Sequence, residues 1–360
     1  MKYIGQSDYQ HYSTPRIGVL LTNLGTPTAP TAKALKPYLK QFLWDPRVVE
    51  VPRPIWWLIL NGIILNTRPK RSAEAYKAVW SERGSPLLAH LEDQVAGVSA
   101  QLEARFGNRF IVRGAMRYGA PAINTVLAEM FDAGMEQLVV LPLYPQYGGP
   151  TTGSTFDEIA AEFTRRRWLP SFRFVSAYHD DPRYIRAMAD SIEAHWAVHG
   201  RADKLLLSYH GMPKRYLVEG DPYHCQCYKT SRLIGEALHL TEEEMMTTFQ
   251  SRFGREEWLQ PYTDETLKAL PSEGVTSVQV ICPGFSADCL ETIEEIGMEN
   301  RDYFLEAGGT RYEYIPCLNA EPGHVTALTE LLADQMQGWL TKKHDPAISD
   351  RLARDLGAPH

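Results

Sequence analysis

LLLSYHG, at residues 205–211, is a short apolar run that ends in a polar residue and a glycine. A run this short and this apolar is typical of a β-strand that is buried on both faces, as the strands of a parallel sheet are. A second run of the same kind, GVLLTNLG, occupies residues 18–25. Each run predicts a strand that ends in a turn, and in open α/β sheets ligands bind just beyond such carboxyl ends.

Eight runs of this kind occur along the chain, at residues 17–24, 110–116, 138–144, 172–177, 205–209, 247–253, 278–281 and 312–315. Helical patterns separate them, at residues 73–80, 122–133, 184–199, 291–304 and 325–340 among others. This alternation predicts βαβ units and therefore parallel sheets.

The order of the runs looks duplicated. GVLLTNLG, VRGAMRYG, LVVLPLYPQY and FRFVSAY are followed by LLLSYHG, TFQSRFG, VQVICPGFSAD and YEYIPC. In both series the second run ends in an arginine, an aromatic residue and a glycine, and the third reaches a proline. The pattern predicts an α/β protein of two similar, doubly wound domains with parallel sheets and a cleft between them. Chance similarity among short strands is the alternative.

The domain boundaries follow from this duplication. We expect an N-terminal domain at residues 1–178, with an apolar lip, and a C-terminal domain at residues 179–320. Residues 321–342 are predicted to form a helix that packs back on the first domain. Residues 343–360 are polar and contain two prolines, so we expect a flexible tail.

Composition narrows the class of protein. The chain has 360 residues and a net charge of −7, without a basic stripe, which argues against a nucleic-acid partner. We see no signal peptide, and the best apolar run, at residues 55–65, is shorter than the roughly 18 residues of a membrane span. We therefore expect a cytoplasmic protein whose five cysteines are reduced. Cys225 and Cys227 are separated by one residue, so a metal or cluster there is the less favoured alternative.

His210 follows the strand LLLSY and precedes Gly211. A histidine at a strand end can accept a proton near neutral pH, or it can bind a metal through a neutral nitrogen. A turn histidine that is satisfied by the backbone is the alternative. The position of His210 in the sequence is compatible with both interpretations.

An acidic row lies in ADCLETIEEIG, at residues 287–297. Asp288, Glu291 and Glu295 are spaced i, i+3 and i+7, which predicts one face of an α-helix. Acidic residues in a first helical turn are also favoured by the helix dipole, which is the simpler explanation. Glu291 and Glu295 repel each other unless a cation or a shared proton relieves them, so the row is a candidate track for a divalent cation.

Aromatic and cationic residues end other strands. Arg117 and Tyr118 close one run, Tyr144 closes the next, and Trp258 follows the run that ends at residue 253. The Gly- and Thr-rich stretch at residues 148–154 is able to hold an anion. It lacks the lysine of a P-loop, and no G-x-G-x-x-G follows the first strand, so nucleotide binding is not supported.

Residues 54–67 form an apolar segment that contains Trp56 and Trp57 and is followed by Arg68, Lys70 and Arg71. A core helix is the first interpretation. An exposed lip beside cations, suited to a hydrophobic substrate or a membrane surface, is the second.

Taken in order, the motifs resemble those of the ferrochelatase family, whose members insert ferrous iron into a porphyrin. The resemblance runs from about residue 18 to residue 340. It rests on LLTNLGTP, RGSPL, MRYG, LPLYPQYGGPTTGST, SYHGMPKRY, FQSRFGREEWLQPYTDETL and CPGFSADCLETIEEIG. It implies two Rossmann-like domains with the porphyrin cleft between them.

The resemblance also implies roles for particular residues. His210 and Glu291 fall on the family's essential histidine and glutamate, which are assigned to catalysis and to iron, with Asp288 and Glu295 on the acidic line. The residues implied at the porphyrin cleft are Leu24, Trp56, Trp57, Tyr76, Arg117, Tyr118, Tyr144 and Trp258. Animal members have a histidine where this chain has Cys289, so any role of that histidine is in doubt here.

The implied function is that of a bacterial-type ferrochelatase, which converts protoporphyrin IX and ferrous iron to protohaem in the last step of haem biosynthesis. Another tetrapyrrole chelatase, acting with coproporphyrin or cobalt, and a porphyrin-binding protein without catalysis are the alternatives. We expect no tightly bound cofactor, with Fe(II) as a substrate. The animal-type [2Fe–2S] cluster is not expected, because its internal cysteine position reads Gly149 and no cysteine follows Cys317. Peripheral membrane contact and a monomer are the remaining expectations.

Overall fold

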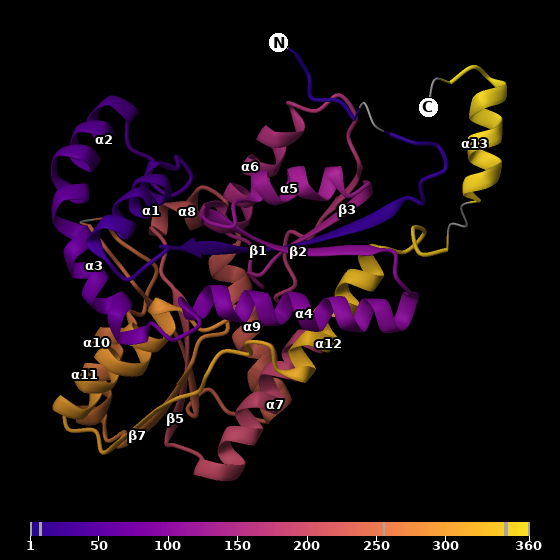
Figure 1. The fold of residues 1–360 in the computed structure, drawn as a ribbon. Coiled ribbons are helices and arrows are strands. Elements are labelled where there is room, and N and C mark those ends of the chain that lie inside the picture. The colour runs from indigo at the N-terminus through magenta and orange to yellow at the C-terminus, as the bar shows by residue number, and fades with distance from the viewer. Residues whose placement is uncertain (1, 7–8, 255, 342–344, 359–360) are drawn as a thin grey trace.

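The computed structural model describes residues 2–6, 9–254, 256–341 and 345–358, and its core consists of two four-stranded sheets (Figure 1). All strand pairs within both sheets are parallel. The first sheet has the order β2-β1-β3-β4 and the second the order β6-β5-β7-β8, so the two have the same topology. The predicted fold class is confirmed, and each of the eight predicted runs overlaps one strand.

The first sheet comprises β1 (Arg16–Thr26), β2 (Phe110–Gly119), β3 (Met135–Pro142) and β4 (Ser171–Phe174). Its side chains alternate between two cores. Leu20 packs in one cluster with residues of α5 (Ile123–Asp132) and α6 (Ser154–Phe163), whereas Val19 and Leu21 pack in another with residues of α4 (Pro86–Phe106). Burial on both faces explains why these strands read as continuous apolar runs.

The second sheet comprises β5 (Lys204–His210), β6 (Met245–Gln250), β7 (Ser277–Ile281) and β8 (Arg311–Tyr314). Leu205 and Leu207 pack with residues of α7 (Pro182–His199) and α9 (Tyr223–Leu238). Leu206 faces the opposite core, which includes Ile296 and Phe304. That core is covered by α10 (Thr263–Ala269), η4 (Glu291–Glu299) and α11 (Asn300–Glu306).

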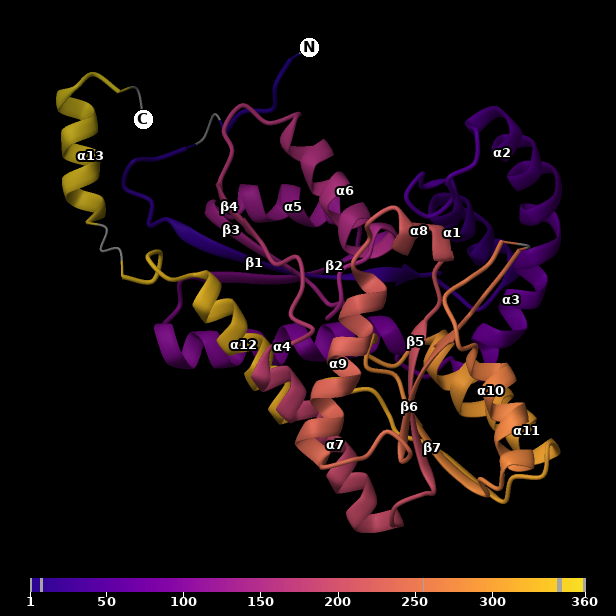
Figure 2. The same cartoon turned by 180° about the vertical axis from the view of Figure 1, so that it is seen from behind.

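Side chains from both sheets share one hydrophobic cluster, which contains Leu21 of β1 and Leu207 of β5. α12 (Pro322–Gln335) packs against α4 and against α7, so the last long helix contacts elements of both halves (Figure 2). The predicted boundary between residues 178 and 179 lies between β4 and α7. In the predicted tail, residues Pro346–Asp355 form a further helix, α13, which the sequence pattern did not indicate, while residues 342–344 and 359–360 lie outside the described residues.

A helical segment, called the lip here, projects from the first half at one end of the molecule (Figure 1). It consists of α2 (Arg53–Ile59), the π-helical turn η1 (Leu60–Ile64) and α3 (Leu65–Val79), and α1 (Ala32–Trp44) packs against it. The two tryptophans of this segment differ, since Trp56 is buried, as in a core helix, and Trp57 is 54% exposed. No helix in the described part of the chain is long and apolar enough to cross a membrane.

The remaining helical elements are short connections. They are η2 (Gly149–Gly153), α8 (Lys214–Val218) and η3 (Leu270–Glu273).

Candidate active site

A cavity lies between the two halves, at the carboxyl ends of their strands. Parallel strands bring their end residues to one edge, and this edge of each sheet faces the other half. Of the residues predicted from the sequence, five line the cavity: Leu24, Tyr76, Tyr144, His210 and Glu291.

His210 is the last residue of β5. Its Nδ1 lies 2.7 Å from the carbonyl oxygen of Gly211. Because a carbonyl oxygen only accepts, Nδ1 carries the hydrogen and donates it, which leaves Nε2 as an unprotonated acceptor in the neutral ring. The two interpretations of this histidine are therefore compatible, since the backbone satisfies one nitrogen and leaves the other with a free lone pair.

Glu291 is the first residue of η4, a π-helix rather than the predicted α-helix. The helical backbone begins at Leu290, so Asp288 precedes the helix and lies in the loop that follows β7. The prediction that Asp288, Glu291 and Glu295 line one face of an α-helix is therefore wrong for Asp288. The spacing rule failed because it assumed that the helix begins at Asp288.

Asp288 also differs from Glu291 in its surroundings, because it is 7% exposed and does not line the cavity. Its carboxylate accepts hydrogen bonds from Tyr314, at 2.5 Å, and from Asn319, at 2.7 Å. A buried carboxylate that is satisfied in this way holds structure together.

Glu295 lies one turn beyond Glu291 and accepts hydrogen bonds from the backbone N–H of Ser251, at 2.8 Å, and from its hydroxyl. Burial raises the pKa of Glu295 to about 7, the negative charge of Glu291 adds to the rise, and the hydrogen bonds from Ser251 oppose it. Glu295 is therefore able to exchange a proton near neutral pH.

Cys289, at the position where animal relatives have histidine, lines the cavity beside Glu291. Burial raises the pKa of its thiol well above the usual value, and the charge of Glu291 raises it further. The thiol therefore stays protonated and neutral, and Cys289 does not supply the cation that a protonated histidine would supply.

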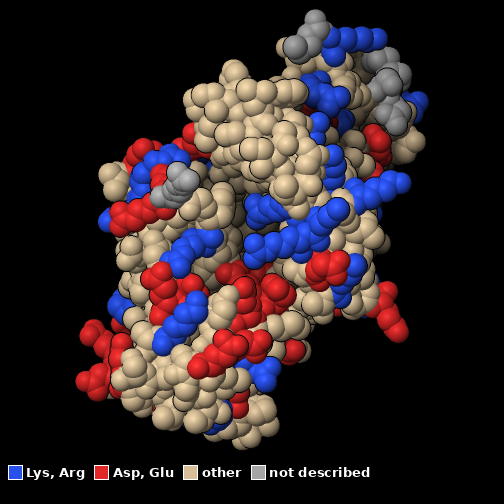
Figure 3. Space-filling view, turned by 90° about the vertical axis from the view of Figure 1, so that its left-hand side faces the viewer, with Lys and Arg blue, Asp and Glu red and all other residues tan. Residues whose placement is uncertain are grey.

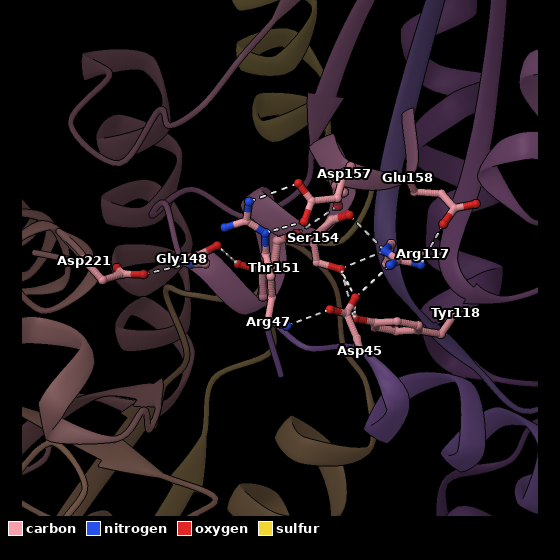
Figure 4. Close-up of polar contacts among 12 residues, drawn as sticks. Asp45, Arg47, Arg117, Tyr118, Gly148, Thr151, Ser154, Asp157, Glu158 and Asp221 are labelled. Atoms are coloured by element: carbon pink, nitrogen blue, oxygen red, sulfur yellow. Dashed lines mark hydrogen bonds and ion pairs between the residues drawn. The ribbon is translucent and has the colours of Figure 1, made fainter. Parts of the chain in front are cut away.

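Arg117 and Tyr118, which the resemblance implied at the cleft, do not line this cavity. Both are bound to Asp45, as Figure 4 shows. One carboxylate oxygen of Asp45 accepts from Arg117 at 2.7 Å, Tyr118 at 2.8 Å and Ser154 at 2.6 Å. Burial alone would raise the pKa of Asp45, but these hydrogen bonds and the Arg117 charge outweigh it and lower the pKa.

Asp45 lies between α1 and the lip, so the network in Figure 4 fastens the base of the lip to β2 and α6. This role could not be predicted from a local motif, because Asp45 is 72 residues away from Arg117 in the chain. Ser251, which holds Glu295, was missed for the same reason.

Trp56 and Trp258 line a second hollow, between the lip and the second half. Pro213 and Phe253 share its wall, so much of the wall is apolar, and Arg68 lies at its edge above the ring of Phe253. Trp57 does not line either hollow and points to the outside of the lip.

Charges of opposite sign meet beside the lip, where α3 packs against η4. Figure 3 shows a belt of Lys and Arg next to a patch of Asp and Glu, at a hollow in this face of the molecule. Burial raises the pKa of Glu294 and the charge of Glu299 adds to the rise, whereas Arg71 opposes it. The acidic side chains of η4 therefore continue from the cavity toward the surface.

The fold is similar to that of solved structures. The structure described as SirB from Bacillus subtilis with Fe3+ has a TM-score of 0.53 at 14% sequence identity and covers 90% of this chain and 97% of its own. The two chains therefore share a fold.

Sequence relatives define the family. Residues 16–336 match the family described as Ferrochelatase. The ferrochelatase of Marinobacter nauticus is 62% identical over 353 residues, 98% of this chain and 95% of the relative, and that of Idiomarina loihiensis is 64% identical over 339 residues, 94% and 93% of the two chains. The chain belongs to the ferrochelatase family, as its motifs indicated.

In the part of the chain that the structure describes, no group of three or more His, Cys, Asp or Glu is placed to hold a metal ion. Cys225 is exposed and Cys227 is buried, so the two thiols of the pair differ in their access to solvent.

The Asp45 network predicts a large loss of stability on truncation. In D45A the Arg117 guanidinium, whose side chain is 12% exposed, loses its buried partner. We expect a fall of about 3 kcal/mol in the free energy of unfolding, measured by chemical denaturation. D157A is the matched control, because it breaks the exposed pair with Arg47 and is expected to cost less than about 1 kcal/mol. Equal losses in the two variants would contradict the anchoring role of Asp45.

The raised pKa of Glu295 predicts a pH-dependent stability. The folded state disfavours the ionised form, so the free energy of unfolding falls as the pH rises from the ordinary pKa of 4.5 to about 7. E295Q removes this loss, so its stability relative to the unaltered protein is expected to rise by about 2 kcal/mol between pH 4.5 and pH 7.5. Urea denaturation at a series of pH values measures the difference, and a constant difference across this range would show that the pKa is not raised.

Proposed function

We propose that the protein is a ferrochelatase, a lyase that inserts ferrous iron into protoporphyrin IX to give protohaem, the last step of haem biosynthesis. The observation that carries the proposal is a cavity lined by both His210 and Glu291, in a chain of the ferrochelatase family. A histidine lone pair and a carboxylate are the two groups that this chemistry needs.

The reaction exchanges two protons for one metal ion. Free-base porphyrin loses its two pyrrole N–H protons as Fe(II) enters, so the enzyme needs a proton acceptor and a weak metal ligand. The free Nε2 of His210 is suited to accept a pyrrole proton, and the carboxylate of Glu291 is suited to hold Fe(II) before it is transferred. Glu295, with a pKa of about 7, is a proton acceptor behind Glu291.

The flat macrocycle shields its nitrogens, so insertion requires that the ring be bent. Contacts remote from the nitrogens provide the binding energy for this distortion. We place the porphyrin edges in the hollow between Trp56 and Trp258, with Leu24 and Tyr76 against the ring in the inner cavity. The charge of Arg68 at the edge of the hollow suits a propionate.

Iron is a substrate in this proposal, and no resident cofactor takes part. The side chains of η4 lead from Glu291 through Glu294 to Glu299, and their negative charge favours the approach of a divalent cation.

The lip suggests a contact with the membrane surface. Ile55, Trp57, Leu58 and Ile63 are 55%, 54%, 65% and 61% exposed. An exposed apolar helix face beside cations is typical of helices that lie in a membrane interface. Porphyrin and haem dissolve poorly in water, so we propose that the cytoplasmic enzyme exchanges them at the bilayer, with the lip in contact with it.

The test of function is anaerobic incubation of the protein with Fe(II) and either protoporphyrin IX or coproporphyrin III, followed by absorption spectroscopy. We expect H210A and E291Q each to lower the insertion rate by about a hundredfold or more, since each removes a group that acts on the reacting atoms. Porphyrin binding, measured by the change in porphyrin fluorescence, is expected to survive in both variants.

The outcomes of this test separate the candidate functions. Near-normal turnover of H210A would refute the role of His210. Binding without insertion by the unaltered protein would indicate a carrier, and faster turnover of coproporphyrin III would indicate the other tetrapyrrole substrate.

The membrane contact predicts that the double variant W57S/L58S binds anionic vesicles at least about tenfold more weakly than the unaltered protein, because it removes apolar surface from the lip. Sedimentation with vesicles measures the binding. V198S is the control, since Val198 is 77% exposed on α7, away from the lip. Equal binding by all three proteins would exclude the lip as the contact.

A further inference from the structure

Residues 284–291 form one wall of the cavity and end in Glu291. Every residue of this segment except Asp288 lines the cavity. Most of the segment is a loop between β7 and η4, outside the regular hydrogen bonds of sheet and helix. The position of Glu291 therefore depends on the contacts that hold this loop.

The buried carboxylate of Asp288 holds the loop in place through hydrogen bonds. Its carboxylate accepts from Asn319 at 2.7 Å, Tyr314 at 2.5 Å, Thr292 at 3.1 Å and the backbone N–H of Cys317 at 3.3 Å. Three of these bonds end on Oδ1 and the one from Asn319 ends on Oδ2, so both carboxylate oxygens are held. Asp288 is buried and does not line the cavity, so it acts as an anchor of the loop.

Asn319 forms a two-way pair with Asp288. The backbone N–H of Asp288 donates to Oδ1 of Asn319 at 2.8 Å, and Nδ2 of Asn319 donates back to the carboxylate. Asn319 has a φ of 47°, in the left-handed region, which an asparagine tolerates better than most residues. The backbone carbonyl oxygen of Asn319 accepts a hydrogen bond from Nδ1 of His324 at 2.7 Å.

Gln94 ties the same loop to the first half of the molecule. It lies on α4 and is fully buried. Its Nε2 donates to the carbonyl oxygen of Ser286 at 3.0 Å, to the hydroxyl of Ser286 at 3.1 Å and to the carbonyl oxygen of Asn319 at 2.9 Å. One amide group therefore connects α4, the cavity loop and the turn before α12.

We propose that Gln94 and Asn319 are positioning residues for metal insertion. Gln94 fixes the start of the cavity loop to the first half, where Leu24 and Tyr144 line the cavity, and Asn319 fixes the middle of the loop through Asp288. Together they set where the Glu291 carboxylate lies relative to a porphyrin. The inference rests on the proposed function, and neither side chain lines the cavity itself.

The test compares Q94A and N319G with the unaltered protein in the anaerobic insertion assay. Glycine adopts a positive φ without strain, so N319G removes the side chain and keeps the backbone. We expect kcat to fall about tenfold or more in each variant, because a small misplacement of a reacting group is costly, while KM for porphyrin changes less than about twofold.

A double variant distinguishes positioning from a general loss of structure. If Asn319 acts through Glu291, adding N319G to E291Q causes no further fall in kcat, because the group that it positions has already been removed. Q279A is the matched control. Gln279 is 1% exposed in β7, donates to the carbonyl oxygen of Gly200 and to Glu313, and lies outside the cavity lining. We expect Q279A to lower the melting temperature and leave kcat unchanged.

Each outcome decides the proposal. Unchanged kcat in Q94A and N319G, additive losses with E291Q, or an equal loss in Q279A would overturn the positioning role and leave the proposed function intact. No insertion by the unaltered protein would overturn both. If N319G does not fold, Q94A and its double variant with E291Q decide the outcome. They remove the hydrogen bonds that hold the cavity loop to α4 and leave Asn319 intact.

Discussion

The site depends on one constraint, the common direction of the strands. Because all strands within each sheet are parallel, residues that are far apart in the sequence reach the same edge of a sheet. Leu24 lies two residues before the end of β1 and His210 is the last residue of β5, and both line one cavity because the two edges face each other. The shared hydrophobic cluster and the packing of α12 against α4 and α7 hold the two edges together.

Four carboxylates, those of Asp45, Asp288, Glu291 and Glu295, occupy different environments in this framework, and the environment determines what each does. Asp45 faces Arg117 and three other donors, so its pKa is lowered and it anchors the lip. Asp288 has four hydrogen-bond donors and anchors the cavity loop. Glu291 lines the cavity, and Glu295 lies behind it with a pKa of about 7. Residue type alone does not separate anchor, metal ligand and proton acceptor, because donors and burial make the difference.

Much of the fold was predictable from the sequence because strands buried on both faces leave a local pattern. Each of the eight apolar runs overlaps a strand, and their duplicated order reappears as two sheets of identical topology. At the site, His210 could be placed because it follows such a run directly. The partners of Arg117 could not be predicted, since Asp45 is distant in the chain and only the packed lip brings the two together. The predicted helix at residues 291–304 begins where η4 begins, but Asp288 was wrongly placed on its face, because the spacing of acidic residues does not reveal which of them precede the helix.

The repulsion between Glu291 and Glu295 has a physical solution in this structure. Two carboxylates one turn apart destabilise a helix unless a cation or a proton relieves them. Burial and the charge of Glu291 both favour the protonated form of Glu295, and Ser251 limits the rise of its pKa to about 7. A proton at Glu295 therefore removes the repulsion between the two side chains. In the proposed function, the positive charge of Fe(II) held by Glu291 would lower the pKa of Glu295, and the arrival of the metal would then be coupled to the release of a proton.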